Sequence, residues 1–158
     1  MKLIQDNGQP RYGRFDQIPS QINLDDYTYK TPYGDVLTGW RKQLKYKKFK
    51  FCGVQHAHYS IGVAIVDLSW AGHGFFYVYD HASKKVVEWN AIQPLALNTQ
   101  VDEQTLHSKS YFKKSGYQFD MQHANAVRSI QVTKNGEVLL KAQIACAETE
   151  AMSLCSPN

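Results

Sequence analysis

The chain has 158 residues, enough for one domain with a core of its own, and its formal net charge of +4 is too small for a dedicated nucleic-acid binder. Its longest clean apolar run, Ile61 to Val66, is far shorter than the ~20 residues of a membrane-spanning helix. Three cysteines without metal-type spacing favour reduced thiols, and the first residues lack the apolar run of a secretory signal. We therefore expect a cytoplasmic protein without a membrane span.

Two regions of different character follow each other along the chain. Residues 1–43 are rich in Gly, Pro, Asn and Asp, with aromatic residues between them and no sustained helical period. This pattern predicts an irregular but ordered N-terminal wrap. Residues 44–158 show one strand pattern after another and predict an antiparallel β-sheet domain.

The first strands of that domain are unusual because both of their faces are apolar. The stretch LKYKKFKFCGV changes its alternation at Lys47–Lys48, which predicts a bulge or a strand start there. The segments SIGVAIVDLSW (60–70) and FFYVYD (75–80) carry apolar side chains at both odd and even positions. Strands of this kind are covered on both sides, so we expect a core on one face and a second layer or a filled cavity on the other.

The second part of the domain begins with a polar connection, residues 93–108, in which Asp102 is a candidate cap for one short helix. It ends in the hairpin VRSIQVTKNGEVLLKAQIACA (127–147). A three-residue loop, 134–136, would pair Val132 with Val138 and Ile130 with Leu140, with all four on one face. A two-residue turn would instead set a lysine opposite Ile130, so the hydrophobic pattern selects the longer loop.

The fold class predicted from these elements is all-β and antiparallel, with about seven strands in a barrel or sandwich. No internal repeat, low-complexity tract or helical heptad accompanies them.

Several segments, taken in order, resemble the bacterial family known as domain of unknown function 2804. They are DNGQPRYGRF, INLDDY, FCGV, GVAIVDLSWAG, FFYVYD and the closing LCSP. The best-matching positions are Gly8, Asn23, Asp26, Tyr27, Gly62, Ala64, Asp67, Leu68, Phe76, Tyr77, Tyr79 and Asp80. The resemblance covers nearly the whole chain, and it rests on the order of loose motifs rather than on one diagnostic motif.

The resemblance implies a lipocalin-like antiparallel barrel, half-barrel or curved sheet, distantly similar to double-barrel proteins such as carotenoid hydratases. It also implies that the chain corresponds to the N-terminal half of such a protein. A C-terminal half of the barrel is then the expected partner. The family brings no established activity with it.

Two histidines, His56 and His58, are the first candidates for chemistry. On an extended strand, side chains at i and i+2 share a face and lie close enough to hold one ion. A catalytic zinc site needs a third protein ligand. The remaining histidines are His73, His81, His107 and His123, each in a predicted turn or loop. The alternative is that the pair belongs to the connection of a hairpin, and this reading predicts no metal cofactor.

Two acids, Asp67 and Asp80, lie within otherwise apolar strands. A buried carboxylate there would have a raised pKa and is a candidate proton donor for a hydration or cyclisation of an isoprenoid. The alternative is that both acids lie at strand ends and accept hydrogen bonds from turn amides.

Four aromatic residues, Trp70, Tyr77, Tyr79 and Trp89, are candidates to line an apolar ligand cavity, with ordinary core packing as the alternative. The basic stretch Arg41–Lys50 mixes cations with aromatics, as single-stranded nucleic-acid binders do, but its pattern favours a solvated edge strand. We expect no nucleic-acid partner.

Three functions remain open at this point. The first is binding of an apolar or amphipathic small molecule, such as a lipid or isoprenoid, in a β-barrel cavity, without a cofactor. The second is a hydratase- or cyclase-like enzyme that uses a buried carboxylate. The third is a structural or interaction domain that binds no small molecule.

Overall fold

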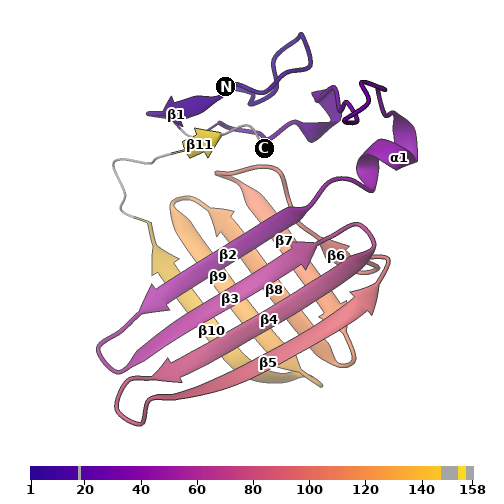
Figure 1. The fold of residues 1–158 in the computed structure, drawn as a ribbon. Helices are drawn as coiled ribbons and strands as arrows, with labels where there is room; N and C mark the ends of the chain where they lie inside the picture. Colours follow the sequence, from indigo (N-terminus) through magenta and orange to yellow (C-terminus); the bar gives the residue numbers. More distant parts are fainter. Residues whose placement is uncertain (18, 147–152, 156–158) are drawn as a thin grey trace.

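The computed structural model describes residues 1–17 and 19–146, and the backbone of residues 153–155. Two antiparallel sheets pack face to face, and their strands cross one another in Figure 1. The first sheet has the order β2-β3-β4-β5, so each strand pairs with its neighbour in sequence. Its strands are β2 (Lys48–Gln55), β3 (Tyr59–Asp67), β4 (Ala71–Asp80) and β5 (Lys85–Pro94).

The second sheet has the order β10-β9-β8-β7-β6 and is again a meander. Its strands are β6 (Thr99–Gln100), β7 (Ser108–Lys114), β8 (Tyr117–Ala124), β9 (Val127–Lys134) and β10 (Glu137–Ala145). The chain passes from the first sheet to the second in the turn between β5 and β6, so each sheet is a continuous stretch of sequence.

The prediction of an all-β antiparallel fold with curved sheets is confirmed, and β2 begins at Lys48, where the alternation changes phase. A closed barrel is not formed. Within the described residues no strand of one sheet pairs with a strand of the other, so β2, β5, β6 and β10 remain sheet edges. The described part also has eight long strands instead of about seven.

Aromatic side chains fill the space between the sheets. The largest fully buried side chains are Phe76, Phe112, Phe119, Ile65, Val63 and Val132. The Phe119 ring lies edge-on to Phe76 and Phe112, with centroids 6.3 and 5.8 Å away, and Trp89 stacks on Phe76 at 4.3 Å. Aromatic and aliphatic side chains therefore form a packed core between the sheets.

The N-terminal segment is irregular, as predicted, and it lies over one end of the sandwich (Figure 1). It contains β1 (Gly13–Phe15), which pairs with β11 (Ser153–Cys155), a 3₁₀ turn (Leu24–Asp26) and α1 (Gly39–Gln43). The buried Asn23 side chain holds it together, because its Oδ1 accepts from the Ile4 amide at 2.9 Å and its Nδ2 donates to the Ile4 carbonyl at 3.0 Å.

The connection between β6 and β7 also differs from the prediction, because residues 101–107 form no helix. Asp102 instead accepts hydrogen bonds from the amides of Gln104, at 2.9 Å, and Lys109, at 3.0 Å. Its carboxylate thus stabilises a turn, and these hydrogen bonds replace the capping contacts that a helix would need there. Within the described residues, no helix has the length and apolar character needed to cross a bilayer.

The register of the last hairpin was predicted wrongly by two residues. The turn is the two-residue loop 135–136, and the register shifts between Val138 and Leu140. Val132 therefore pairs with Leu140, and Ile130 pairs with Ala142. A bulge adds one residue and restores the apolar face that a plain two-residue turn would lose. Because a slip of two residues leaves every side chain on its face, the hydrophobic pattern could not detect the error.

We predict that Phe119→Ala lowers the free energy of unfolding by about 3–5 kcal/mol, because it opens a cavity where three rings meet. The matched change Phe49→Ala removes a ring that is 61% exposed on the outer side of the first sheet, and should cost less than about 1 kcal/mol. Urea unfolding followed by circular dichroism measures both. Equal losses would contradict this assignment of the core.

Candidate functional site

The outer side of the first sheet is apolar, whereas the water-facing side of an antiparallel sheet is usually polar. In Figure 1 this side faces the viewer, and no described element crosses in front of β2–β5. Strand alternation and the pairing register bring its side chains into rows across the sheet, for example Phe49, Val66, His73 and Ile92. We call it the aromatic face, made of Phe49, Phe51, Val66, His73, Phe75, Tyr77, Tyr79 and Ile92.

Glycines in β2 and β3 leave room for two rings of this face. A Cβ atom at Gly62 would lie 2.4 Å from the Tyr77 ring, so Tyr77 covers β3 at the point where the sequence leaves room. A Cβ atom at Gly53 would lie 3.1 Å from the Phe51 ring. Phe49 and Phe51 are stacked, with centroids 6.2 Å apart and planes 8° from parallel. The face is therefore a layer of packed rings.

His73 is a polar side chain in the row Phe49, Val66, His73 and Ile92, and Glu88 and Asn90 of β5 lie on the same side of the sheet. Its Nε2 is buried and has no hydrogen-bond partner among the described residues, and its ring lies 5.2 Å from Phe75. Burial lowers the pKa of His73, and the Glu88 carboxylate partly opposes this shift. A buried polar atom without a partner is costly, so this atom points to a group outside the described residues that would bond to it.

The four aromatic residues predicted to bind a ligand do not form one site. Tyr77 and Tyr79 lie on the aromatic face, and Trp70 is 60% exposed in the turn beside it. Trp89 faces the other way and stacks on Phe76 in the core. Two of the four, Tyr77 and Tyr79, thus lie on the aromatic face, which is outside the sandwich.

The two candidate acids stabilise turns. The Asp67 Oδ1 atom accepts from the Ser69 amide at 2.7 Å, where Ser69 has a left-handed φ of 68°. The Asp80 Oδ1 atom accepts from the amides of Ala82, at 2.8 Å, and Ser83, at 3.2 Å. The bonds from Ser83 and Ala82 lower the pKa of Asp80. A proton donor needs a raised pKa, so Asp80 is shifted in the wrong direction for that role.

The histidine pair lies in the connection between β2 and β3. His56 and His58 are both exposed, with ring centroids 5.5 Å apart, and the His56 amide donates to the Tyr59 carbonyl at 2.8 Å. Among the residues that the structure describes, no three His, Cys, Asp or Glu side chains gather into a possible metal site.

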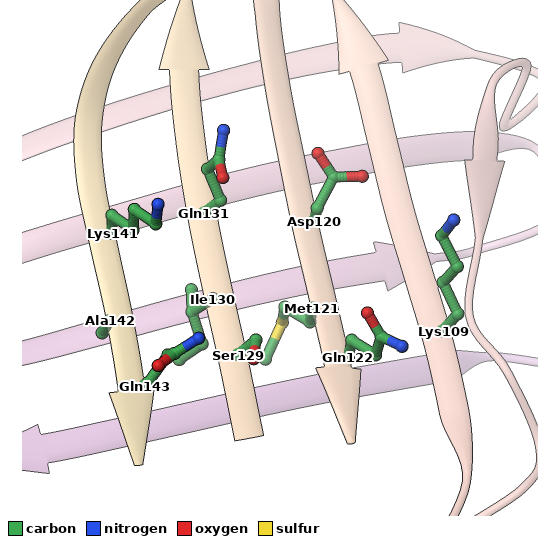
Figure 2. A pocket seen from close by; sticks show the side chains of 10 residues that line it. All are labelled: Lys109, Asp120, Met121, Gln122, Ser129, Ile130, Gln131, Lys141, Ala142 and Gln143. Carbon is green, nitrogen blue, oxygen red and sulfur yellow. The ribbon is translucent and has the colours of Figure 1, made fainter. Parts of the chain in front are cut away.

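The outer side of the second sheet is polar and contrasts with the aromatic face. Figure 2 shows Lys141, Gln131 and Asp120 in one row across β10, β9 and β8, and the register pairs them in that order. They line a shallow hollow of about 190 Å³. This is the ordinary solvated side of an antiparallel sheet, so the hollow adds no candidate chemistry.

A second small pocket opens between the two sheets beside β2, and the sequence did not predict it. Lys50 of β2 and Arg128 of β9 line it, and so do His123 of β8 and the buried Cys52. Lys50 and Cys52 share a face of β2, so a cation in phase with a core residue was the signal available in the sequence. Only the tertiary packing shows that residues of β8 and β9 lie beside Lys50.

Two crossed antiparallel sheets with an ordered N-terminal segment define an all-β sandwich protein. The family model described as domain of unknown function (DUF2804) matches residues 1–158. The chain belongs to this family, as its sequence predicted. No curated protein and no solved structure matches the chain, so the lipocalin-like relationship stays a prediction.

We predict that Asp80→Asn destabilises the protein at pH 7 and that the difference from the wild type disappears in acid. A lowered folded-state pKa contributes stability above the ordinary aspartate pKa of about 4, and that contribution is lost as the pH falls further. Urea unfolding at pH 7 and pH 3 tests this. The same difference at both pH values would contradict a charge-dependent turn contact.

We predict that wild-type stability falls as the pH drops below about 6.5 partly because of His73, whose pKa is lowered in the folded state. The unfolded chain takes up a proton there, while the folded chain resists it. His73→Phe should remove this part of the pH dependence and raise stability at pH 7. Urea unfolding at pH 7.5 and 5.5 measures both effects, and unchanged pH dependence would contradict the prediction.

Proposed function

We propose that this domain is an interaction module that binds an apolar partner through the aromatic face. The observation that carries the proposal is the pair of unlike sheets. The second sheet has a polar outer side, whereas the first has rings and aliphatic side chains there. Antiparallel sheets that face water alternate between apolar and polar residues, and two apolar faces are typical of a sheet covered on both sides.

The exposed area of the face is in the range of a partner surface. Phe49 and Ile92 are each 61% exposed, Phe51 is 44% exposed, and Trp70 at the rim is 60% exposed. These four side chains present on the order of 500 Å² before the half-buried rings are counted. The largest apolar patch of a typical monomer is about 300–600 Å², and a standard interface buries about 800 Å² per partner.

The partner that fits this face is the apolar side of a second β-domain, which the family resemblance supplies as a C-terminal half. Few charged residues lie in the rows of the aromatic face. A sheet or an apolar loop can therefore exclude water from this face without burying an unpaired ion. A partner group near His73 would also satisfy the buried Nε2.

A second candidate is an apolar or amphipathic small molecule, such as a lipid or isoprenoid, bound on the same face. Tyr77 and Tyr79 support it, because two of the predicted ligand-binding residues lie on this face. This version differs from the sequence-based one in its location, because the ligand would lie on the outer side of the first sheet and not inside a barrel. A cytoplasmic location agrees with either candidate and stays a prediction.

A hydratase or cyclase function draws no support from the candidate acids. Asp67 and Asp80 each accept a hydrogen bond from a turn amide, and neither lines the pocket between the sheets. Neither proposed function includes a catalytic step.

We predict that the double variant Phe49→Ser, Ile92→Ser loses binding to the C-terminal half of a full-length family member supplied as a separate polypeptide. Removing two exposed apolar side chains from one row should weaken the complex by about tenfold or more. The control Leu106→Ser, Val138→Ser removes two exposed apolar side chains elsewhere and should change binding less than about twofold. Isothermal titration calorimetry measures both.

The same variants separate the two candidates. Mass spectrometry of extracts detects lipid that co-purifies with each variant. Lipid bound to the wild type and the control, but not to the double variant, would favour the small-molecule candidate. No complex with the second half and no bound lipid would reject both candidates.

A further inference from the structure

A pocket of about 150 Å³ lies at the edge of the sandwich, between the edge strand β2 and the strands β8 and β9. The residues of interest fall into two groups. The cationic or ionisable group is Lys50, His123 and Arg128, and the apolar group is Cys52, Met121 and Ile130. The pocket therefore has one charged side and one side continuous with the hydrophobic core, to which Cys52, Met121 and Ile130 belong.

Strand register explains why a lysine side chain enters the space between the sheets. Lys50 pairs with Ile65, and Cys52 pairs with Val63, so both share the inner face of β2 with core residues. The Lys50 Nζ atom donates a hydrogen bond to the hydroxyl of Ser108, which is itself buried. The ammonium group is thus held at the inner surface.

The charge of Lys50 lacks the compensation that its neighbour has. Two residues earlier on the same face, the Lys48 Nζ atom lies 2.7 Å from a Glu103 carboxylate oxygen. Among the described residues no carboxylate lies within ion-pair distance of Lys50. Burial lowers the pKa of Lys50, the Asp102 carboxylate opposes this shift, and Arg128 adds to it by a smaller amount. Lys50, Arg128 and His123 line the same pocket, and charge-assisted hydrogen bonds from such groups favour an anionic ligand.

The third polar group is fixed in orientation. The His123 Nδ1 atom donates to the Thr105 carbonyl at 3.1 Å, because a carbonyl oxygen can only accept. His123 also pairs with Arg128 across β8 and β9, and with Ser108 across β8 and β7. The lysine, its serine partner, the histidine and the arginine are thus brought together by strand register.

We propose that this pocket binds a small organic carboxylate whose short apolar tail lies against Cys52, Met121 and Ile130 while its carboxylate lies between Lys50 and Arg128. A carboxylate accepts several charge-assisted hydrogen bonds, and the arginine fork suits it in geometry. The apolar wall distinguishes this ligand from an inorganic anion, which would gain nothing from that side of the pocket.

The volume limits the size of the ligand. Since a water molecule takes up about 30 Å³ of the liquid, the pocket holds roughly five to eight non-hydrogen atoms. Drug-sized ligands occupy pockets of about 300–1,000 Å³. A carboxylate of four to six carbon atoms therefore matches the pocket, and a full lipid does not.

The experiment is calorimetric titration of the wild-type chain with acetate, butyrate, hexanoate and inorganic phosphate. We expect affinity to rise from acetate to hexanoate by about tenfold or more as methylene groups are buried, and phosphate to bind more weakly than hexanoate. This series requires no variant. No saturable binding of hexanoate, or phosphate binding as tight as hexanoate, would overturn the proposal.

The charged side is tested by Lys50→Gln, which should weaken hexanoate binding by about tenfold or more. Lys45→Gln is the matched control, because it removes the same charge from an exposed residue of the same basic stretch, outside the pocket. Equal effects of the two variants would show that hexanoate binds by general electrostatic attraction, and would overturn the proposed site. Unchanged circular dichroism spectra confirm that both variants fold.

The pocket and the aromatic face share Phe51, so variants at other residues of the face are needed to test the two sites separately. The double variant Phe49→Ser, Ile92→Ser removes no residue that lines the pocket, so it should leave hexanoate binding unchanged. Loss of hexanoate binding in that variant would instead show that the carboxylate binds on the aromatic face, and would overturn the assignment to the pocket.

Discussion

The packing of three phenylalanine rings between two crossed sheets is the interaction on which the rest of this structure depends. Phe76 belongs to the first sheet, and Phe112 and Phe119 belong to the second, and all three are fully buried. Because side chains alternate along a strand, fixing these rings inward also fixes which residues point outward. The aromatic face and the inward position of Lys50 both follow from that choice of phase.

The two outer sides of the sandwich then differ for a reason that lies in residue type. The second sheet continues in the ordinary way, with Gln131 and Lys141 outward opposite Ile130 and Val132 inward. The first sheet places rings on both sides of β4, so burial of one side leaves the other apolar. The domain thus resembles the inner layer of a larger arrangement, which agrees with an interaction role better than with an enclosed ligand cavity.

The fold could be predicted from the sequence further than the site could. Alternation identified the strands, the two-sided character of β3 and β4, and the start of β2 at Lys48. Strand pairing across a turn was less secure, since the slip of two residues in the last hairpin preserves every face. The sequence also could not show whether the sheets close into a barrel. Whether β2 pairs with another edge strand depends on how the sheets cross and not on any local pattern.

The sequence by itself determined the all-β class and the faces of each strand, because these depend on spacing within one segment. It also determined the family, which depends on the order of motifs along the whole chain. Only the tertiary structure decided what those faces meet. It placed Trp89 in the core while Tyr77 lies outside, turned Asp67 and Asp80 toward turn amides, and gathered Lys50 with residues of β8 and β9. Contacts between segments distant in the sequence depend on sheet packing, and a single sequence holds no local signal for that geometry.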